Sequence, residues 1–282
     1  MSEKERVLDK AVMADFESYL RGEEKSRATI EKYMHDVGVF AAFAGKQQIK
    51  KELVLAYKNG LKEGYAVSSA NSMLAALNTF FRFCGWQELC VRRFRVQREA
   101  YCAAEKELTR GEYERLLSAA RVKGQERLNL IIQTICGTGI RVSELQYITV
   151  EAIRRGEATV DCKGKIRRIF LVPALCKKLR CYARERGIGS GCVFVGKHGK
   201  PINRSQIWRE MKQLCHGAGV LPSKVFPHNL RHLFARTFYG IEKDIAKLAD
   251  ILGHASINTT RIYITTTCDE HKRKMANMRL IL

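Results

Sequence analysis

Four short segments in the second half of this 282-residue chain hold arginine, lysine, histidine and tyrosine side chains, without a cluster of carboxylates. Paired guanidinium groups fit the two non-bridging oxygens of a phosphodiester and can hold the extra negative charge of a five-coordinate phosphorus. A tyrosine hydroxyl is a possible covalent nucleophile, and a lysine can protonate a leaving hydroxyl. The set therefore predicts phosphodiester transfer without a divalent metal. Its members are Arg141, Lys163, His228, Arg231, His254 and Tyr263.

The spacing of these residues suggests how they are presented. His228 and Arg231 are three apart at a helix start after Pro227, so both face one side near the positive end of the helix dipole. Gly253 is suited to end a helix and to leave His254 on a turn. A short helical run after Thr260 would present Tyr263. Taken singly, each residue also has an ordinary structural interpretation, as a salt-bridged arginine, a core histidine or a packed aromatic; their order and spacing together favour a site.

The elements expected around these residues make the second half α+β, mostly helical with one small antiparallel sheet. A capping box of Thr109 and Glu112 opens the first helix, and Gly164 supplies the turn of a β-hairpin. Helices are predicted at 110–120, 125–136, 174–186, 203–217, 228–239 and 243–252, hairpin strands at 158–161 and 166–171, and a further short strand at 192–195.

The first half is predicted to be an all-α helical bundle. Ser26 and Thr29 can cap a helix whose apolar positions continue to Phe40, and a second amphipathic stretch spans 67–83. Two more helices are expected at 7–20 and 50–62. The chain thus divides into an N-terminal domain, 1–100, and a C-terminal domain, 101–282.

Composition restricts the class of protein. Hydrophobic residues make up 46% and charged residues 28%, which excludes disordered and fibrous classes. The formal net charge is +21, of which +4 falls in residues 1–100 and +17 in 101–282. Such a surplus calls for a polyanionic partner, with nucleic acid the first candidate and an anionic membrane surface the second. No apolar stretch reaches the roughly 20 residues of a membrane span, and the first residues lack the apolar core of a signal peptide, so a cytoplasmic protein is expected.

The ten cysteines are expected to be free thiols, because no CxxC pair with zinc-ligand spacing occurs. A basic run joins the two predicted domains. It is either a solvated linker or a strap that contacts a phosphate backbone, and the overall charge favours the strap. The arginines of this run are Arg92, Arg93, Arg95 and Arg98.

These motifs resemble the tyrosine recombinases, or phage-integrase family of site-specific DNA recombinases, over nearly the whole chain. GTGIRVSEL resembles the family's first arginine box, HNLRHLFA its HxxR box, and LADILGHASINTTRIYI its final box. In the first half, SRATIEKYMHDVGVFAAF and SSANSMLAALNTFFRF are similar to two helices of the SAM-like core-binding domain.

The resemblance implies a mechanism. Tyr263 would attack a scissile phosphate of double-stranded DNA to give a 3′-phosphotyrosyl link, with Arg141 and Arg231 clamping the phosphate and His254 hydrogen-bonding it. His228 would assist proton transfer, Lys163 would protonate the leaving 5′-oxygen, and Glu144 would be an acidic accessory residue that orients an arginine. Neither metal nor other cofactor is required. Family members act as homotetramers on two DNA sites through a Holliday junction.

Several alternatives stay open from the sequence. Lys165, across Gly164 from Lys163, could be the general acid instead. A type IB topoisomerase or a DNA-binding protein with an inactive site would share much of this pattern. A C-terminal helix carrying Met275, Met278 and Leu282 would either fold back or dock on a neighbouring protomer. Without a separate arm-binding domain ahead of the bundle, a simpler recombinase is expected, carried by a mobile element or resolving replicon dimers. Neither the DNA sequence recognised, the direction of the reaction nor any accessory factor can be assigned.

Overall fold

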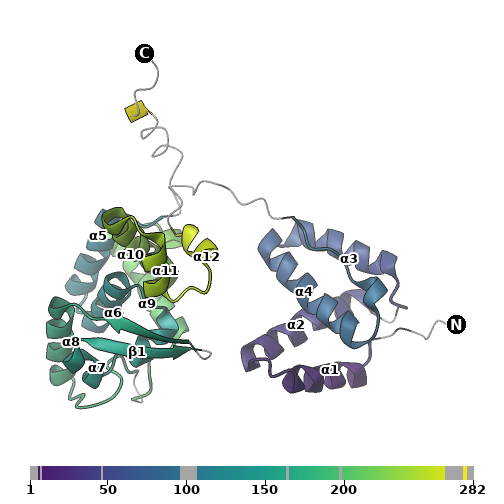
Figure 1. Ribbon diagram of the computed structural model, residues 1–282, viewed down its shortest axis with the longest axis horizontal. Coiled ribbons are helices and arrows are strands. Elements are labelled where there is room, and N and C mark those ends of the chain that lie inside the picture. The colour runs from purple at the N-terminus through teal and green to yellow at the C-terminus, as the bar shows by residue number, and fades with distance from the viewer. Residues whose placement is uncertain are drawn as a thin grey trace. The chain divides into compact units, whose positions relative to one another are not determined.

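The computed structural model describes residues 6, 8–45, 47–95, 107–162, 165–196, 199–263 and 276–277. The chain divides into two compact units, Met1–Arg98 and Glu99–Leu282, which Figure 1 shows in purple to blue and in teal to yellow. Within the described ranges, no helix is long and apolar enough to cross a membrane.

The first unit is a helical bundle, as predicted. Ser26 opens its second helix by accepting a hydrogen bond from the Thr29 backbone N–H at 3.3 Å. Aromatic side chains fill the centre, where Phe16 meets Phe80 edge to face at 5.1 Å between ring centroids. The elements are α1 (Lys10–Gly22), α2 (Arg27–Ala44), α3 (Lys51–Gly64), α4 (Val67–Phe83) and the 3₁₀ turn η1 (Gln87–Leu89).

The second unit is built around α6 (Glu126–Thr138), which contacts α5, α8, α9 and α10. Three isoleucines of α6, at 131, 132 and 135, are fully buried in the core. The predicted capping box is present, since Thr109 and Glu112 satisfy each other's backbone N–H groups at the start of α5. The other elements are α5 (Arg110–Val122), η3 (Val142–Tyr147), α7 (Val150–Arg155), β1 (Glu157–Cys162), β2 (Lys165–Phe170), α8 (Pro173–Glu185), α9 (Arg204–Ala218), η4 (Pro222–Lys224), α10 (Pro227–Glu242), α11 (Ile245–Leu252) and α12 (Ile257–Arg261).

Strands β1 and β2 form a two-stranded antiparallel sheet, the only sheet among the described residues. The register pairs Glu157 with Phe170 at one end and Cys162 with Lys165 at the other. Ala158, Val160 and Ile169 are buried, whereas Ile166 and Phe170 point to solvent. The α+β class with one small sheet is therefore confirmed.

Two local expectations are wrong. The segment predicted as a strand at 192–195 makes only isolated bridges, Thr149 to Cys192 and Val195 to Pro201, so no ladder forms there. Helix α12 begins after its N-cap Ser256, earlier than expected, and ends at Arg261, so Tyr263 follows the helix. The short helix α7 was not anticipated, and the predicted C-terminal helix lies almost entirely outside the described residues.

Candidate active site

Arg231 is the centre of the site. Pro227 occupies the first position of α10 and places Arg231 one turn into the helix, where its side chain is buried. Its guanidinium donates to the carbonyl of Gly139 and, at 2.7 Å, to the carbonyl of Leu252. These two carbonyls belong to the C-terminal ends of α6 and α11, so one side chain joins three helices.

Arg141 reaches the same place from the end of α6. Gly139 ends that helix with a φ of 65°, and the chain then turns into η3. The Arg141 guanidinium donates to Glu144 at 2.9 Å and to the Gly253 carbonyl at 3.4 Å. Its side chain is 41% exposed, so it is open to a ligand.

Glu144 is almost fully buried and behaves as a fixed anion. Burial alone would raise the pKa of its carboxyl, but the backbone N–H of Arg141 and the guanidinium groups of Arg167 and Arg141 bring that pKa below its usual range. Glu144 thus holds the Arg141 guanidinium in place, and its accessory role in the reaction stays a prediction.

A third arginine, which the sequence analysis missed, joins this network. Arg167 lies on β2, is 11% exposed and donates to both Glu144 and the carbonyl of Ile251. Alternation along the strand does not identify it, because Arg167 shares its face with the buried Ile169, whereas the opposite face carries the apolar but exposed Ile166 and Phe170.

His254 follows Gly253, which ends α11 in the left-handed conformation as predicted. Arg231 donates to its Nε2 at 2.9 Å, so that nitrogen is the acceptor and Nδ1 carries the proton. Nδ1 in turn donates to the hydroxyl of the buried Thr260 at 2.9 Å. Burial and the charges of Arg231 and Arg141 lower the pKa of His254 to about 4, so this imidazole is neutral at pH 7.

Tyr263 is 6% exposed and lies among three histidine rings of its own chain. Ring centroids are 5.1 Å away for His254, 5.3 Å for His228 and 4.2 Å for His232, whose plane is inclined by only 19°. The guanidinium carbon of Arg231 lies 5.9 Å from the tyrosine ring centre. The proposed nucleophile is therefore next to the arginine of the same protomer.

The two histidines of α10 differ in their surroundings. His228 is exposed, yet desolvation of its ring and the charges of Arg231 and Arg141 lower its pKa. His232 was missed from the sequence, although it lies four residues after His228 on the same helical face. Burial, His228 and Arg236 lower the pKa of His232 to about 4.

The structure thus brings five of the six predicted catalytic residues together: Arg141, His228, Arg231, His254 and Tyr263. Lys163 lies outside the described residues, and Lys165 is described only as the first residue of β2. The choice between the two lysines stays a prediction. Within the described part of the chain, no group of three or more His, Cys, Asp or Glu side chains could hold a metal ion.

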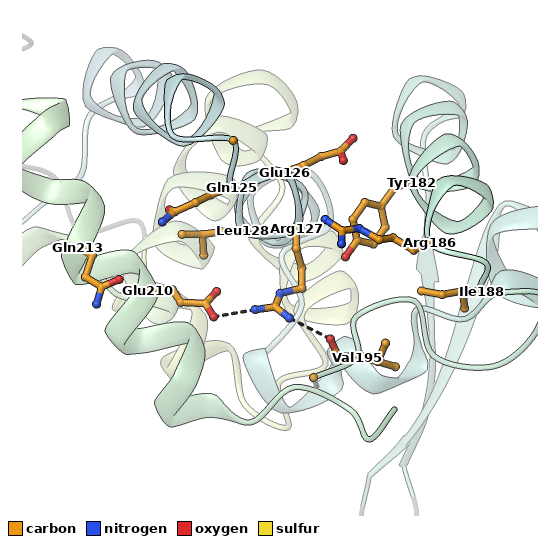
Figure 2. A pocket seen from close by; sticks show the side chains of 12 residues that line it. Gln125, Glu126, Arg127, Leu128, Tyr182, Arg186, Ile188, Val195, Glu210 and Gln213 are labelled. Atoms are coloured by element: carbon orange, nitrogen blue, oxygen red, sulfur yellow. Dashed lines mark hydrogen bonds and ion pairs between the residues drawn. The ribbon is translucent and has the colours of Figure 1, made fainter. Parts of the chain in front are cut away.

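A hollow of about 620 Å³ lies elsewhere on the second unit, at the start of α6 beside α8 and α9. Figure 2 shows Arg127 at its centre, donating to Glu210 at 2.7 Å and to the Val195 carbonyl at 3.1 Å. None of the predicted catalytic residues lines it. The cluster around Arg231 is therefore separate from this hollow.

A cluster with two guanidinium groups, neutral imidazoles and a tyrosine can hold a phosphodiester and attack it. The chain matches the phage integrase family over residues 106–270 and the N-terminal SAM-like domain of phage integrases over residues 13–88. It therefore belongs to the phage integrase family, the family of tyrosine recombinases that the motifs resemble.

Similarity to individual proteins supports this family membership. The chain is 31% identical to tyrosine recombinase XerA of Pyrococcus furiosus, over 99% of this chain and 97% of that protein. A crystal structure of a XerA recombinase is 27% identical, with a TM-score of 0.55, covering 96% of this chain and 99% of the other. A lambda integrase dimer bound to a core site has the same fold, with a TM-score of 0.74 at 18% identity, covering 90% and 94%.

Proposed function

We propose that this protein is a site-specific DNA recombinase that breaks and rejoins strands through a covalent link to Tyr263. The observation that carries the proposal is the position of the Tyr263 ring within 6 Å of both the Arg231 guanidinium and the His254 imidazole. Family membership supplies the substrate class, double-stranded DNA, and the assembly, a homotetramer on two sites.

In the proposed reaction the Tyr263 oxygen attacks phosphorus, a bond from that oxygen to phosphorus forms, and the bond to the 5′-oxygen breaks. The phenolic proton passes to His228, whose lowered pKa favours the neutral imidazole that can accept it. Lys163, or Lys165 in its place, protonates the departing 5′-oxygen. Arg141 and Arg231 hold the charge that develops on the non-bridging oxygens. The 5′-hydroxyl of a partner strand then reverses these steps.

The site must open before it can bind a phosphate in this way. Arg231 is only 1% exposed, its Nη2 is shared between His254 and the Leu252 carbonyl, and the Tyr263 ring lies close to it. Arg141 is accessible without any rearrangement. We therefore propose that the phosphate meets Arg141 first, and that the segment after α12 then shifts to expose Arg231.

The basic run of the first unit is proposed as a second DNA contact. Arg92, Arg93 and Arg95 are exposed, whereas Arg98 lies outside the described residues. Guanidinium groups on an exposed segment can neutralise backbone phosphates whatever the base sequence. A DNA substrate also supports the expected cytoplasmic location.

Trapping of a covalent adduct tests the proposal. A nicked duplex that loses a short strand on cleavage should leave the wild-type protein attached to DNA. Tyr263→Phe removes one oxygen and keeps the ring packing, so this variant should bind the duplex and form no adduct. A persistent adduct in Tyr263→Phe would show that another residue is the nucleophile. A wild-type protein that binds but never forms an adduct would point to an inactive DNA-binding protein.

A further inference from the structure

The chain that follows η1 is held against α4 by two asparagine side chains. Asn78 accepts from the Val91 N–H at 2.9 Å and donates to the Val91 carbonyl at 2.8 Å. Asn71 does the same for Phe94, accepting at 2.7 Å and donating at 3.0 Å. Each side-chain amide thus satisfies both backbone groups of one residue, as a neighbouring β-strand would do.

The spacing of the two asparagines matches the segment that they hold. Asn71 and Asn78 are seven residues apart, which is about 10.5 Å along a helix at 1.5 Å per residue. Val91 and Phe94 are three residues apart, which is about 10 Å in an extended chain at roughly 3.3 Å per residue. The segment is therefore held extended, in a fixed register along α4.

Helix α3 holds the same stretch of chain. Lys51 donates to the carbonyls of Glu88 and Cys90, both at 2.7 Å. Lys58, again seven residues later, lies with its ammonium group 5.0 Å from the centre of the Phe94 ring. Four side chains from two helices therefore fix residues 88–94, and none of them uses an arginine of the basic run.

This arrangement leaves the arginines free to bind. Val91 is buried, whereas Arg92 and Arg93, between the two asparagine contacts, and Arg95, just after them, are exposed. Among the described residues, none of these three arginines is in an ion pair. Their positive charge is displayed on a backbone that cannot easily rearrange.

We propose that Asn71 and Asn78 pre-form a phosphate-binding strap, residues 90–95, so that its arginines meet the DNA backbone without first paying the entropy of ordering a flexible linker. The inference rests on the proposed function, in which this protein binds duplex DNA. Segments that order only on binding lose affinity to that ordering, so a pre-formed strap binds more tightly at the same charge.

The test replaces the asparagines and keeps every arginine. The double variant Asn71→Ala with Asn78→Ala has the same net charge as the wild type. Its matched control is Asn59→Ala, which alters an exposed asparagine on α3 of the same unit. Because Asn78 is buried, Asn71→Ala alone is measured as well, in case the double variant fails to fold. The probe is a 30-base-pair duplex (about three helical turns) of mixed sequence, since phosphate contacts are independent of sequence.

Two quantities are measured: hydrogen exchange at the amides of Val91 and Phe94, and the Kd for the duplex. In the double variant we expect both amides to lose protection and Kd to rise about tenfold. Asn71→Ala should expose only Phe94 and raise Kd less, and Asn59→Ala should change neither. Loss of protection with Kd within about twofold of wild type would overturn the inference, as would retained protection. A separate variant, with Arg92, Arg93, Arg95 and Arg98 all changed to Ala, tests whether the basic run contacts DNA at all. If that variant also leaves Kd unchanged, the basic run is not a DNA contact and the proposed function loses that part. If it alone weakens binding, only the pre-forming role of the asparagines is wrong.

Discussion

At the scale of single residues, His232 has the closest ring contact with the proposed nucleophile. Its imidazole stacks on Tyr263 with ring centroids 4.2 Å apart, while its lowered pKa keeps it uncharged at pH 7. A neutral ring in this place supports the tyrosine by packing, since offset-stacked aromatic pairs are favourable beyond their buried area. We infer that His232 positions Tyr263 and takes no proton in the reaction.

Two substitutions at this position separate packing from proton transfer. His232→Ala removes the stacking partner and should slow single-turnover cleavage about 10- to 100-fold, because small misplacements of a reacting group are costly. His232→Phe keeps a ring and should retain most of the wild-type rate. Cleavage rates on a nicked duplex, compared across pH, provide the measurement. Equal losses in both variants would assign a chemical role to the imidazole nitrogens.

The histidines also predict how stability depends on pH. The pKa values of His232 and His254 are lowered to about 4 in the folded protein, against about 6.5 in an unfolded chain. The unfolded state therefore binds more protons between these values, and stability is present above pH 6.5 and lost as pH falls towards 4. For each histidine the free energy of unfolding changes by at most about 1.4 kcal/mol per pH unit, and partial solvent access of the ring reduces this value. We expect the free energy of unfolding in urea to be about 2 kcal/mol lower at pH 5 than at pH 7. His232→Phe, which cannot titrate, should flatten the dependence, and an unchanged slope would show that His232 contributes nothing to it.

At the scale of the elements, the end of α6 determines where both arginines lie. Gly139 has a positive φ, and its carbonyl accepts a hydrogen bond from Arg231. A Cβ at this position would lie 2.3 Å from a ring carbon of Phe234 and 3.1 Å from a methyl carbon of Leu252. Glycine is therefore required here both by the backbone conformation and by the close packing of α10 and α11.

Gly139→Ala should lower the free energy of unfolding by about 2–4 kcal/mol, the sum of a left-handed residue with a side chain and an overpacked contact. Gly156 provides the control, because its φ is 78° but a Cβ there would meet only the Leu171 carbonyl, at 4.0 Å. Gly156→Ala should cost about 1 kcal/mol, the backbone contribution alone. Urea unfolding of both variants measures the difference. Equal losses would mean that Phe234 moves aside without cost.

Local signals explain why most elements could be predicted from the sequence. Helix ends depend on residues that are close in sequence, so a short stretch of sequence is enough to predict them. Examples are the Thr109 capping box, the Ser26 N-cap and the end of α11 at Gly253. The strand predicted at 192–195 failed because a β-ladder depends on a partner elsewhere in the chain, and only isolated bridges formed. Arg167 and His232 were missed for the same reason: their roles come from Glu144 and Tyr263, which lie 23 and 31 residues away in sequence.

At the scale of the whole molecule, charge is distributed unevenly. Residues 101–282 have a net charge of +17, whereas residues 1–100 have only +4. In the first unit many basic side chains are neutralised nearby, as Arg21 is by Glu17 at 2.5 Å and Arg27 by Glu31 at 2.8 Å. Arg92, Arg93 and Arg95, by contrast, lie close together in the chain, and no ion pair among the described residues neutralises them.

This distribution predicts the salt dependence of DNA binding. For B-form DNA the logarithm of the binding constant falls with the logarithm of salt concentration, with a slope of about −0.9 for each phosphate neutralised. Replacing Arg92, Arg93, Arg95 and Arg98 with Ala should therefore weaken binding to all sequences alike and reduce the slope by up to about 3.6. Four exposed basic residues of α1, of α2 and of the turn between them, changed to Ala together, remove the same charge and should alter the slope much less: Lys10, Arg21, Lys25 and Arg27. Fluorescence anisotropy across a salt series gives both slopes. If the salt slope falls equally in the two variants, net charge alone governs binding and the arginines of the basic run contribute no more than other basic residues. If the variant of the basic run changes only which DNA sequence is preferred, its arginines contact bases and not phosphates.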